Sequence, residues 1–292
     1  MKETYRETKF RPDSLELIAR CEEIVTDYLG QGLRLTLRQL YYQLVTKNII
    51  KNEERSYKNL SSLVSDARLS GMLDWEAIED RIRVPVSPAE WSSIKDLVDS
   101  ALYSYRLPRW ENQENYVELW VEKDALAGVL RPLAHEYHVT MMVNRGYSSQ
   151  SAMYEAGKRY GREQFGERKL TLLYLGDFDP SGEDMVRDIA DRMEMFGIEV
   201  TVNKIALTLN QVQHYKPPPN PTKHSDPRSA EFIAKYGASS WEVDAINPGE
   251  LRKIIRRHIE RYIDKDAMRI IVEKENDDKR KLTKAVEEIM NG

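Results

Sequence analysis

Four apolar runs in the second half of the chain have the pattern of buried β-strands. They are apolar throughout rather than alternating with polar residues, as strands of a parallel sheet are when both faces are covered. Stretches with helical spacing separate these runs, and strand, helix, strand at such intervals predicts a parallel α/β sheet with right-handed crossovers. The expected strands are 116–121, 139–144, 170–175 and 199–207, and the expected helices between them are 126–137, 151–165 and 184–196.

The pattern before this region is helical. Residues 12–109 are expected to form a compact helical region, and the polar, proline-containing run 106–115 to link it to the sheet. Thr36 followed three residues later by Gln39 is a capping-box pattern, so a helix is expected to begin at Leu37. This divides the chain into a first domain at 1–110 and a second at 116–292.

A second helix is expected at 57–72, followed by the strand-like segment 75–86. Two helices joined in this way suit a winged helix-turn-helix, which lays its second helix in a DNA groove. A plain helical domain with a mixed-charge surface is the alternative, because acidic residues interleave with the basic ones. The basic side chains that would contact phosphate are Lys47, Lys51, Arg55, Lys58, Arg68, Arg81 and Arg83.

The last eighty residues differ again. The segment 216–228 contains five prolines and is expected to be an extended loop, either a connector or a functional flap. A helix is expected to begin near Pro248, because an apolar stripe with helical spacing follows it. That stripe consists of Leu251, Ile254, Ile255 and Ile259.

Composition narrows the class of protein. With 292 residues, 41% hydrophobic and 32% charged, the chain is expected to be a soluble globular protein. No apolar run approaches the roughly 20 residues of a membrane helix, and the N-terminus lacks the apolar core of a signal peptide. The single cysteine, Cys21, cannot form an internal disulfide, so the cytoplasm is the expected location. A net charge of −4 leaves nucleic-acid binding open, since a basic groove can be local.

Three carboxylates stand where the predicted strands end. Asp177 and Asp179 follow the run LTLLYLG, and Glu122 follows the run VELWV. The carboxyl ends of parallel strands lie along one edge of the sheet, so these side chains are expected to form one pocket, with Phe178 turned to the core. Such a cluster repels itself without a cation, and oxygen ligands suit Mg²⁺ or Mn²⁺. The five histidines do not have the spacing of zinc ligands.

The helix expected from Leu37 brings together a second pair of candidate residues. Helical spacing assigns Tyr41 to the buried face and places Tyr42 on an exposed face beside Arg38, four residues earlier. A guanidinium can bind the nonbridging oxygens of a phosphodiester while the phenol oxygen attacks phosphorus. The alternative is an ordinary solvated contact between two surface side chains.

The motifs together resemble a known superfamily. The segments WVEKD, NRGYSS and LGDFDPSGEDM, in that order, resemble the Toprim domain of topoisomerases, primases and certain nucleases, and TLRQLYYQLV resembles the tyrosine motif of a winged-helix domain. This combination resembles the topoisomerase VI A subunit and the meiotic double-strand-break transesterases, in a compact stand-alone form. The resemblance implies that Tyr42 is the nucleophile, that Arg38 assists it, and that Glu122, Asp177 and Asp179 hold the metal.

The resemblance also implies a reaction and partners. The reaction is Mg²⁺-dependent cleavage of double-stranded DNA through a 5′-phosphotyrosyl intermediate, in which Glu122 takes part in catalysis as well as in metal binding. In the family the tyrosine of one protomer works with the metal of another, which implies a homodimer. The topoisomerase uses a separate ATPase subunit, and this chain has no G-x-x-x-x-G-K-[ST] phosphate loop of its own.

Three hypotheses therefore remain open. The first is a tyrosine transesterase, and the second is a hydrolytic Toprim endonuclease in which Tyr42 only faces the substrate. The third is a non-catalytic DNA-binding subunit. Carboxylates clustered without a purpose are costly, which disfavours the third.

Overall fold

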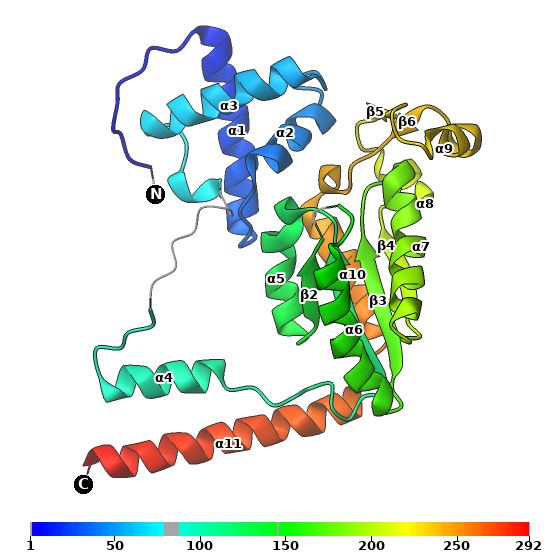
Figure 1. The fold of residues 1–292 in the computed structure, drawn as a ribbon. Helices are drawn as coiled ribbons and strands as arrows, with labels where there is room; N and C mark the ends of the chain where they lie inside the picture. The colour runs from blue at the N-terminus through cyan, green and yellow to red at the C-terminus, as the bar shows by residue number, and fades with distance from the viewer. Residues whose placement is uncertain (1, 79–87, 145, 292) are drawn as a thin grey trace.

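A four-stranded parallel sheet forms the centre of the chain (Figure 1). The computed structural model describes residues 2–78, 88–144 and 146–291. The strands lie in the order β2, β1, β3, β4, and all neighbouring pairs are parallel. The predicted mixed α/β class and parallel sheet are confirmed. The strands are β1 (Asn115–Val121), β2 (Thr140–Val143), β3 (Lys169–Leu175) and β4 (Thr201–Ala206).

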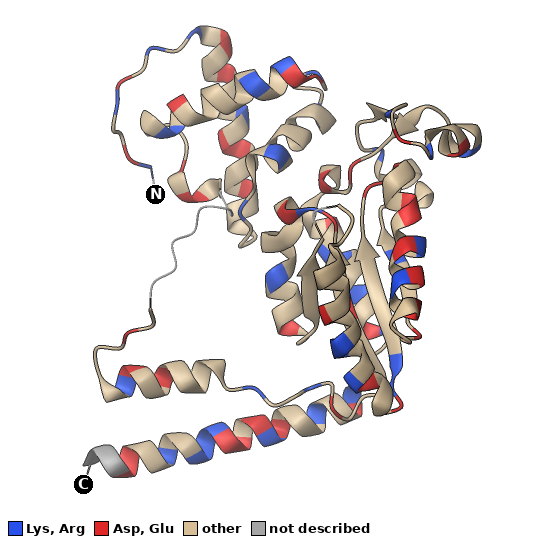
Figure 2. Ribbon diagram, viewed as in Figure 1, with Lys and Arg blue, Asp and Glu red and all other residues tan. Residues whose placement is uncertain are grey.

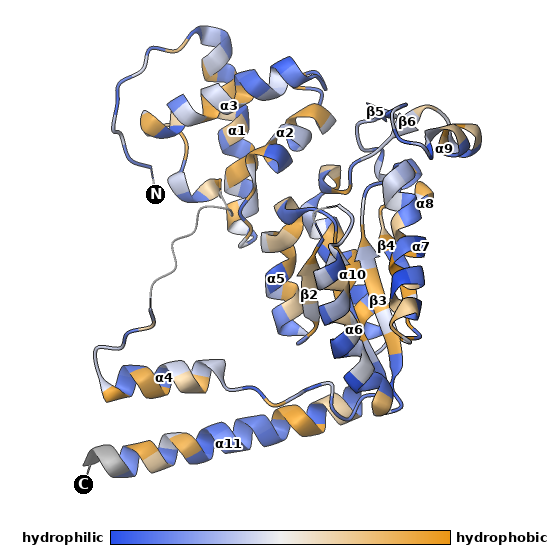
Figure 3. Ribbon diagram, viewed as in Figure 1, coloured by the Kyte–Doolittle hydropathy of each residue, from blue (hydrophilic) through white to orange (hydrophobic). Residues whose placement is uncertain are grey.

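Helices cover both faces of the sheet, which explains the uniformly apolar strands. On one face, buried residues of α6 and α7 pack against Trp120, Leu172 and Tyr174. On the other face, α5 and α10 pack against Leu119 and Leu173 (Figures 1 and 3). The covering helices are α5 (Ala127–Glu136), α6 (Gln150–Phe165), α7 (Pro180–Met195) and α10 (Pro248–Glu260).

The N-terminal helices are α1 (Pro12–Gly30), α2 (Leu37–Thr46) and α3 (Glu54–Leu69). The predicted capping box is confirmed, because the Thr36 side chain accepts a hydrogen bond from the Gln39 backbone N–H and the Gln39 side chain accepts one from Thr36. A short 3₁₀ helix, η1 (Trp75–Ala77), follows, and Ile78 pairs with Leu35 in an isolated parallel bridge. The rest of the strand-like segment expected at 75–86, with Arg81 and Arg83, lies outside the described residues.

Two helices form an arm at the base of the sheet. These are α4 (Ile94–Ser104) and α11 (Lys265–Asn291), which pack side by side and extend away from the sheet (Figure 1). Basic and acidic residues interleave along α11 (Figure 2). Although α4 falls within the range 1–110 expected for the first domain, it packs along α11. The domain boundary near residue 110 stays a prediction.

The chain between β4 and α10 makes an excursion beyond the carboxyl end of the sheet. It contains α8 (Leu209–Tyr215), β5 (Asn220–Pro221), α9 (Ser229–Tyr236), β6 (Ser239–Ser240) and the 3₁₀ helix η3 (Val243–Ala245). The proline-rich part is a loop, as expected, but it is extended only in its first half, because residues 224–228 form turns. It also contains the two-residue strand β5, which pairs with β6. We call residues 209–240 the flap. Across the described ranges, no helix combines the length and apolarity needed to cross a membrane.

Candidate functional site

Glu122 and Asp177 lie side by side at the carboxyl end of the sheet. Glu122 directly follows β1, and its Oε2 accepts hydrogen bonds from the Asp177 backbone N–H at 3.0 Å and from the Tyr174 hydroxyl at 3.4 Å. Adjacent parallel strands thus bring together two of the three predicted acids. Gly176 permits this approach, because a Cβ at that position would lie 2.8 Å from the same Glu122 oxygen.

Asp179 begins the helix that follows β3. Its Oδ1 accepts hydrogen bonds from the Gly182 backbone N–H at 2.6 Å and from the Ser181 hydroxyl at 3.0 Å, so it caps α7. Phe178, between the two aspartates, is 2% exposed and packs against Phe232 and Tyr236 of α9, as the sequence predicts. The helix starts four residues before the expected position because Asp179 and Pro180 form its cap and first residue.

The loop that carries these aspartates is held tightly. Lys204 of β4 donates hydrogen bonds from Nζ to the backbone carbonyls of Asp177, at 2.6 Å, and Gly182, at 3.1 Å, and to Glu183 at 2.7 Å. A Cβ at Gly182 would lie 2.2 Å from the Asp177 carbonyl oxygen, so only glycine fits this turn. The loop between β3 and α7 is therefore fixed both by the hydrogen bonds from Lys204 and by the close approach of Gly182 to Asp177.

Lys123 lies at the centre of a cluster of carboxylates. Its Nζ is 2.8 Å from Asp177 Oδ2, 2.9 Å from Glu242 Oε2 and 3.4 Å from Asp244 Oδ1. Glu242 and Asp244 come from the segment after the flap, and Asp244 is completely buried. Sequence reasoning did not select either residue for the site. The available signal was the pattern WEVD, which repeats the spacing of two acids around one apolar residue seen in DFD.

Backbone pairing attaches this second acidic segment to the first. Phe178 and Trp241 form an isolated antiparallel bridge, with reciprocal N–H to carbonyl distances of 2.8 and 3.0 Å. The Val243 backbone N–H also donates to Asp177 Oδ1 at 2.9 Å. Asp177, Glu242 and Asp244 therefore have a fixed relation to one another, set by these hydrogen bonds.

Burial and neighbouring charges shift the pKa values in this cluster. Burial raises the pKa of Asp177, Lys123 opposes that rise, and the nearby carboxylate of Glu122 adds to it. Burial alone would lower the pKa of Lys123, but the carboxylates of Asp244, Asp177 and Glu242 together raise it above its ordinary value. Lys123 is accordingly a protonated ammonium at neutral pH, surrounded by carboxylates.

Arg38 and Tyr42 reach the same cluster from α2. Arg38 Nη2 is 3.5 Å from the Tyr42 hydroxyl and forms an ion pair with Glu242, while Arg38 Nε is 3.1 Å from Asp244 Oδ2. The structure thus connects Tyr42 to Asp177 through Arg38, Glu242 and Lys123.

The prediction that Tyr42 lies on an exposed face is wrong. Tyr42 is 4% exposed and Tyr41 5%, so both phenols are buried. Tyr41 is buried within the N-terminal helices, where its ring meets the Tyr57 ring edge to face, whereas η3 packs against α2 and covers the face that carries Tyr42. Burial, followed by the charge of Glu242, raises the pKa of Tyr42 above its ordinary value, while Arg38 opposes that rise.

The predicted DNA-contacting residues differ in their surroundings. Lys47, Lys51 and Lys58 are exposed, although Lys58 pairs with Glu54 at 2.7 Å. Arg68 is partly buried: its guanidinium lies over the Trp75 ring and donates to the Trp75 carbonyl at 2.7 Å. Its side chain is thus part of the packing between α3 and η1.

The predicted metal ligands Glu122, Asp177 and Asp179 are carboxylates, which suit Mg²⁺ in chemistry, but their side chains are engaged in other contacts. Asp177 Oδ2 is paired with Lys123, and Asp179 Oδ1 caps α7. Within the described parts of the chain, no three or more His, Cys, Asp or Glu side chains are grouped so that they could hold a metal ion. The three acids still supply hard oxygen ligands at one sheet edge, which is the donor set Mg²⁺ prefers. Glu122, Asp177 and Asp179 stay the predicted ligands of such an ion.

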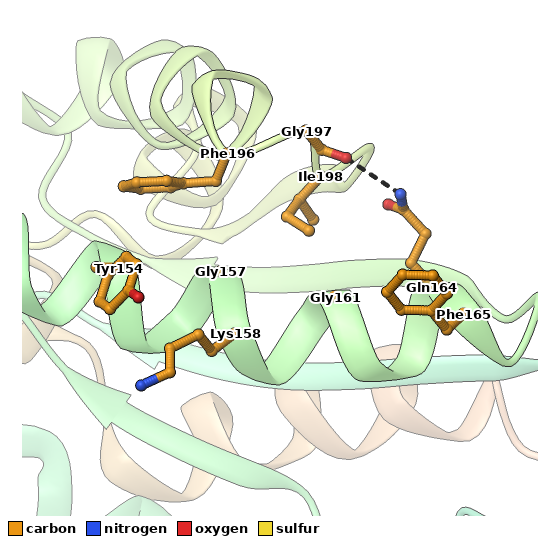
Figure 4. A pocket seen from close by; sticks show the side chains of 9 residues that line it. All are labelled: Tyr154, Gly157, Lys158, Gly161, Gln164, Phe165, Phe196, Gly197 and Ile198. Carbon is orange, nitrogen blue, oxygen red and sulfur yellow. Dashed lines mark hydrogen bonds between the residues drawn. The ribbon is translucent and has the colours of Figure 1, made fainter.

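A pocket of about 420 Å³ lies elsewhere, between α6 and the turn after α7 (Figure 4). Tyr154, Phe165, Phe196 and Ile198 line it, and Lys158 is the charged residue among those labelled. It contains none of the acids described above, so the acidic edge of the sheet remains the candidate site.

In comparisons with known proteins, no family model matches this chain, and no curated protein matches its sequence.

Proposed function

We propose that this chain cleaves double-stranded DNA in a Mg²⁺-dependent reaction, as a winged-helix and Toprim protein similar to the topoisomerase VI A subunit. One observation carries the proposal: Tyr42 and Arg38 of α2 meet the acidic edge of the sheet through Glu242 and Lys123, more than eighty residues away in sequence. An arginine that binds phosphate oxygens, a tyrosine that can attack phosphorus and carboxylates that can hold a metal are groups that serve phosphodiester cleavage by transesterification.

The reaction is a transesterification. Tyr42 Oη forms a bond to phosphorus, the bond between phosphorus and the 3′ oxygen breaks, and the phenol proton passes through solvent to the released 3′ oxygen. The products are a 5′-phosphotyrosyl bond and a free 3′ hydroxyl, so the strand can be rejoined. Arg38 binds the nonbridging phosphate oxygens. A Mg²⁺ ion held by Glu122, Asp177 and Asp179 would supply positive charge for the phosphate.

Hydrolysis is the second candidate, and the burial of Tyr42 favours it. A phenol that is 4% exposed, with a raised pKa, is a poor nucleophile until the contact between α2 and η3 opens. In this alternative, water attacks phosphorus and Tyr42 only faces the substrate. The two candidates differ in whether protein remains attached to the broken strand.

The test uses supercoiled plasmid with Mg²⁺ or Mn²⁺, quenched with detergent and examined for DNA that carries covalently bound protein. We expect attachment in the wild type, loss of it in Tyr42→Phe, and loss of all cleavage in Asp177→Ala. Tyr103→Phe is the matched control, because Tyr103 is 78% exposed on α4 and far from the site in sequence. Free 5′ ends that persist in Tyr42→Phe would refute the transesterase and support hydrolysis.

The proposal includes two partners besides DNA. A second copy of the chain would allow both strands to be cut, and a separate ATPase subunit would couple ATP hydrolysis to the reaction. Lys47, Lys51 and Lys58 would contact phosphates next to the cleaved bond, and Arg68 would join them only if its guanidinium left the Trp75 ring and carbonyl. Cleavage that appears only after co-expression with an ATPase would support the second partner.

A further inference from the structure

We propose that the arm formed by α4 and α11 binds the arm of a second copy of this chain, with the outer halves of the two α11 helices packed antiparallel. The homodimer is part of the proposed function, and the role of the dimer rests on that function. The contact surface is assigned from the arm itself, so its test measures association of the chain rather than cleavage of DNA.

The first step is the apolar stripe of α4, which is only half covered. Helical spacing places Ile94, Leu97, Val98, Ala101 and Leu102 on one side of the helix. Val98 and Leu102, on one flank of this stripe, are partly buried, whereas Ile94 is 71% and Leu97 44% exposed on the other. None of the 11 residues of α4 is buried. Packing of an apolar stripe supplies most of the stability of a short helix, so the exposed flank has room for a further partner.

The second step is the course of α11 beside α4. Tyr105, directly after α4, donates a hydrogen bond to Asp278 at 3.0 Å, and the Leu107 backbone N–H donates one to Glu275 at 3.1 Å. The two segments run in opposite directions, so α4 lies along the outer half of α11, residues 279–291 (Figure 1). Leu282 in this half is still 39% exposed. The pair of helices therefore leaves apolar surface uncovered on both of them.

The outer half of α11 continues a coiled-coil spacing. Its seam residues recur at intervals of three and four positions, which is the heptad pattern: Val272, Glu275, Lys279, Leu282 and Val286. Asp278, which Tyr105 contacts, marks the flank of this seam that faces α4. The opposite flank carries Arg280, Thr283 and Glu287, which are all exposed. This second flank is where another helix can pack.

The third step is the charge on that free flank. Arg280 and Glu287 are seven residues apart, so they lie on the same side of the helix, about 10 Å from each other along its axis. Arg280 pairs with Asp277 at 3.3 Å, and Glu287 has no ion pair among the described residues. An antiparallel second helix centred between these two positions places Arg280 of each chain beside Glu287 of the other. A parallel one would place like charges side by side.

These features select a second copy of the chain as the occupant. A surface whose opposite charges pair with themselves across a twofold axis is typical of an isologous homodimer. Nucleic acid would require one sign of charge, but basic and acidic residues interleave along α11 (Figure 2). The arm extends away from the sheet, so a second arm can reach it (Figure 1). Two helices over about 20 Å present roughly 400 Å² per chain, which is a small interface, so we expect dissociation in the micromolar range.

Sedimentation equilibrium of the full chain, from about 1 to 100 μM, measures this association. We expect a monomer–dimer equilibrium in the wild type, and Leu97→Asp should weaken it about 30-fold or more because it puts a charge into the apolar contact. Phe165→Asp is the matched control, since Phe165 is 95% exposed on α6, outside the arm, and this variant should dimerise like the wild type. A wild type that stays monomeric throughout, or a dimer that survives Leu97→Asp, would overturn the proposal.

Charge reversals test the antiparallel pairing without removing apolar surface. Arg280→Glu and Glu287→Arg should each weaken dimerisation about 10-fold, because like charges then face one another twice. An equimolar mixture of these two variants should form a mixed dimer with roughly wild-type affinity, since both cross-chain pairs are again opposite in charge. The pairing of Arg280 with Asp277 stays broken in that mixture, so recovery reports contact between chains. A mixture that dimerises no better than its components would overturn the antiparallel pairing.

The outcomes for the dimer and for the proposed function are separable. A wild type that dimerises through the arm but leaves plasmid intact under every condition would refute the proposed function and leave this inference standing. A wild type that cleaves plasmid as a monomer would do the reverse.

Discussion

Glu275 of α11 should control whether α11 stays attached to the segment before β1 that contains Leu107 and Arg109. Its side chain is 1% exposed and pairs with Arg109 at 3.1 Å and Lys279 at 3.0 Å, and it accepts the Leu107 backbone N–H at 3.1 Å. Burial alone would raise its pKa, but the hydrogen bonds from Arg109, Lys279 and Leu107 lower it from 4.5 to about 2. The charge therefore stabilises the folded arrangement.

The lowered pKa gives the size of the effect. A fall from 4.5 to about 2 corresponds to roughly 3 kcal/mol at neutral pH. The paired side chains of Arg109 and Lys279 are 19% and 23% exposed, and solvent will reduce this value. We expect Glu275→Gln to lower the free energy of opening α11 by about 2 to 3 kcal/mol, which would speed amide exchange there roughly 30- to 140-fold.

The pH dependence has a definite sign. A depressed carboxyl pKa contributes stability that is fully present above about pH 4.5 and is lost as the pH falls towards 2. The difference between wild type and Glu275→Gln should therefore shrink by more than half between pH 7 and pH 3.

Hydrogen exchange of α11, followed by mass spectrometry at both pH values, measures these differences. Glu273→Gln is the matched control, because this carboxylate lies on the same helix but is 64% exposed. Equal exchange in wild type and Glu275→Gln at pH 7 would show that the buried charge does not hold the arm.

Three further outcomes are expected. Gly182→Ala should lower the free energy of unfolding by about 1 to 3 kcal/mol, because the added Cβ would lie 2.2 Å from the Asp177 carbonyl oxygen. An unchanged melting curve would contradict the tight turn. Cys21 should not react with a thiol reagent until the protein is unfolded in urea, since the side chain is completely buried and burial raises its pKa to about 12; rapid labelling of the native protein would disagree. Glu118→Gln should cost about 3 kcal/mol in urea unfolding, because Arg159 pairs with this buried carboxylate at 2.9 and 3.1 Å, whereas a loss below 0.5 kcal/mol would show that the pair is dispensable.

The sheet could be predicted from sequence because its strands are covered on both faces. In β3, for example, Leu172, Leu173 and Tyr174 are all buried. The strand therefore appears in the sequence as an uninterrupted apolar run whose ends are easy to recognise. Each expected strand matches an observed one within two residues at either end. The start of α7 was less predictable, since the cap at Asp179 was interpreted as part of the metal site rather than as a helix boundary.

The candidate site was only partly predictable, because half of it depends on tertiary contacts. Helical spacing describes how α2 packs on its own domain, and so it identified Tyr41 as buried but could not show that η3 covers Tyr42. Glu242 and Asp244 were missed because they reach the site only through the return of the chain after the flap. That return depends on the bridge at Trp241, which no local pattern indicates.

The bridge between Phe178 and Trp241 has a consequence for how this protein can change over evolution. It attaches the chain that follows the flap to the loop after β3, so the chain leaves the sheet edge after β4 and comes back to the same edge in a fixed register. Residues can be added or removed at the far end of such a closed loop without moving the acids at its base. The flap can therefore diverge in length and sequence, and acquire new binding preferences, while the geometry at the sheet edge is inherited unchanged.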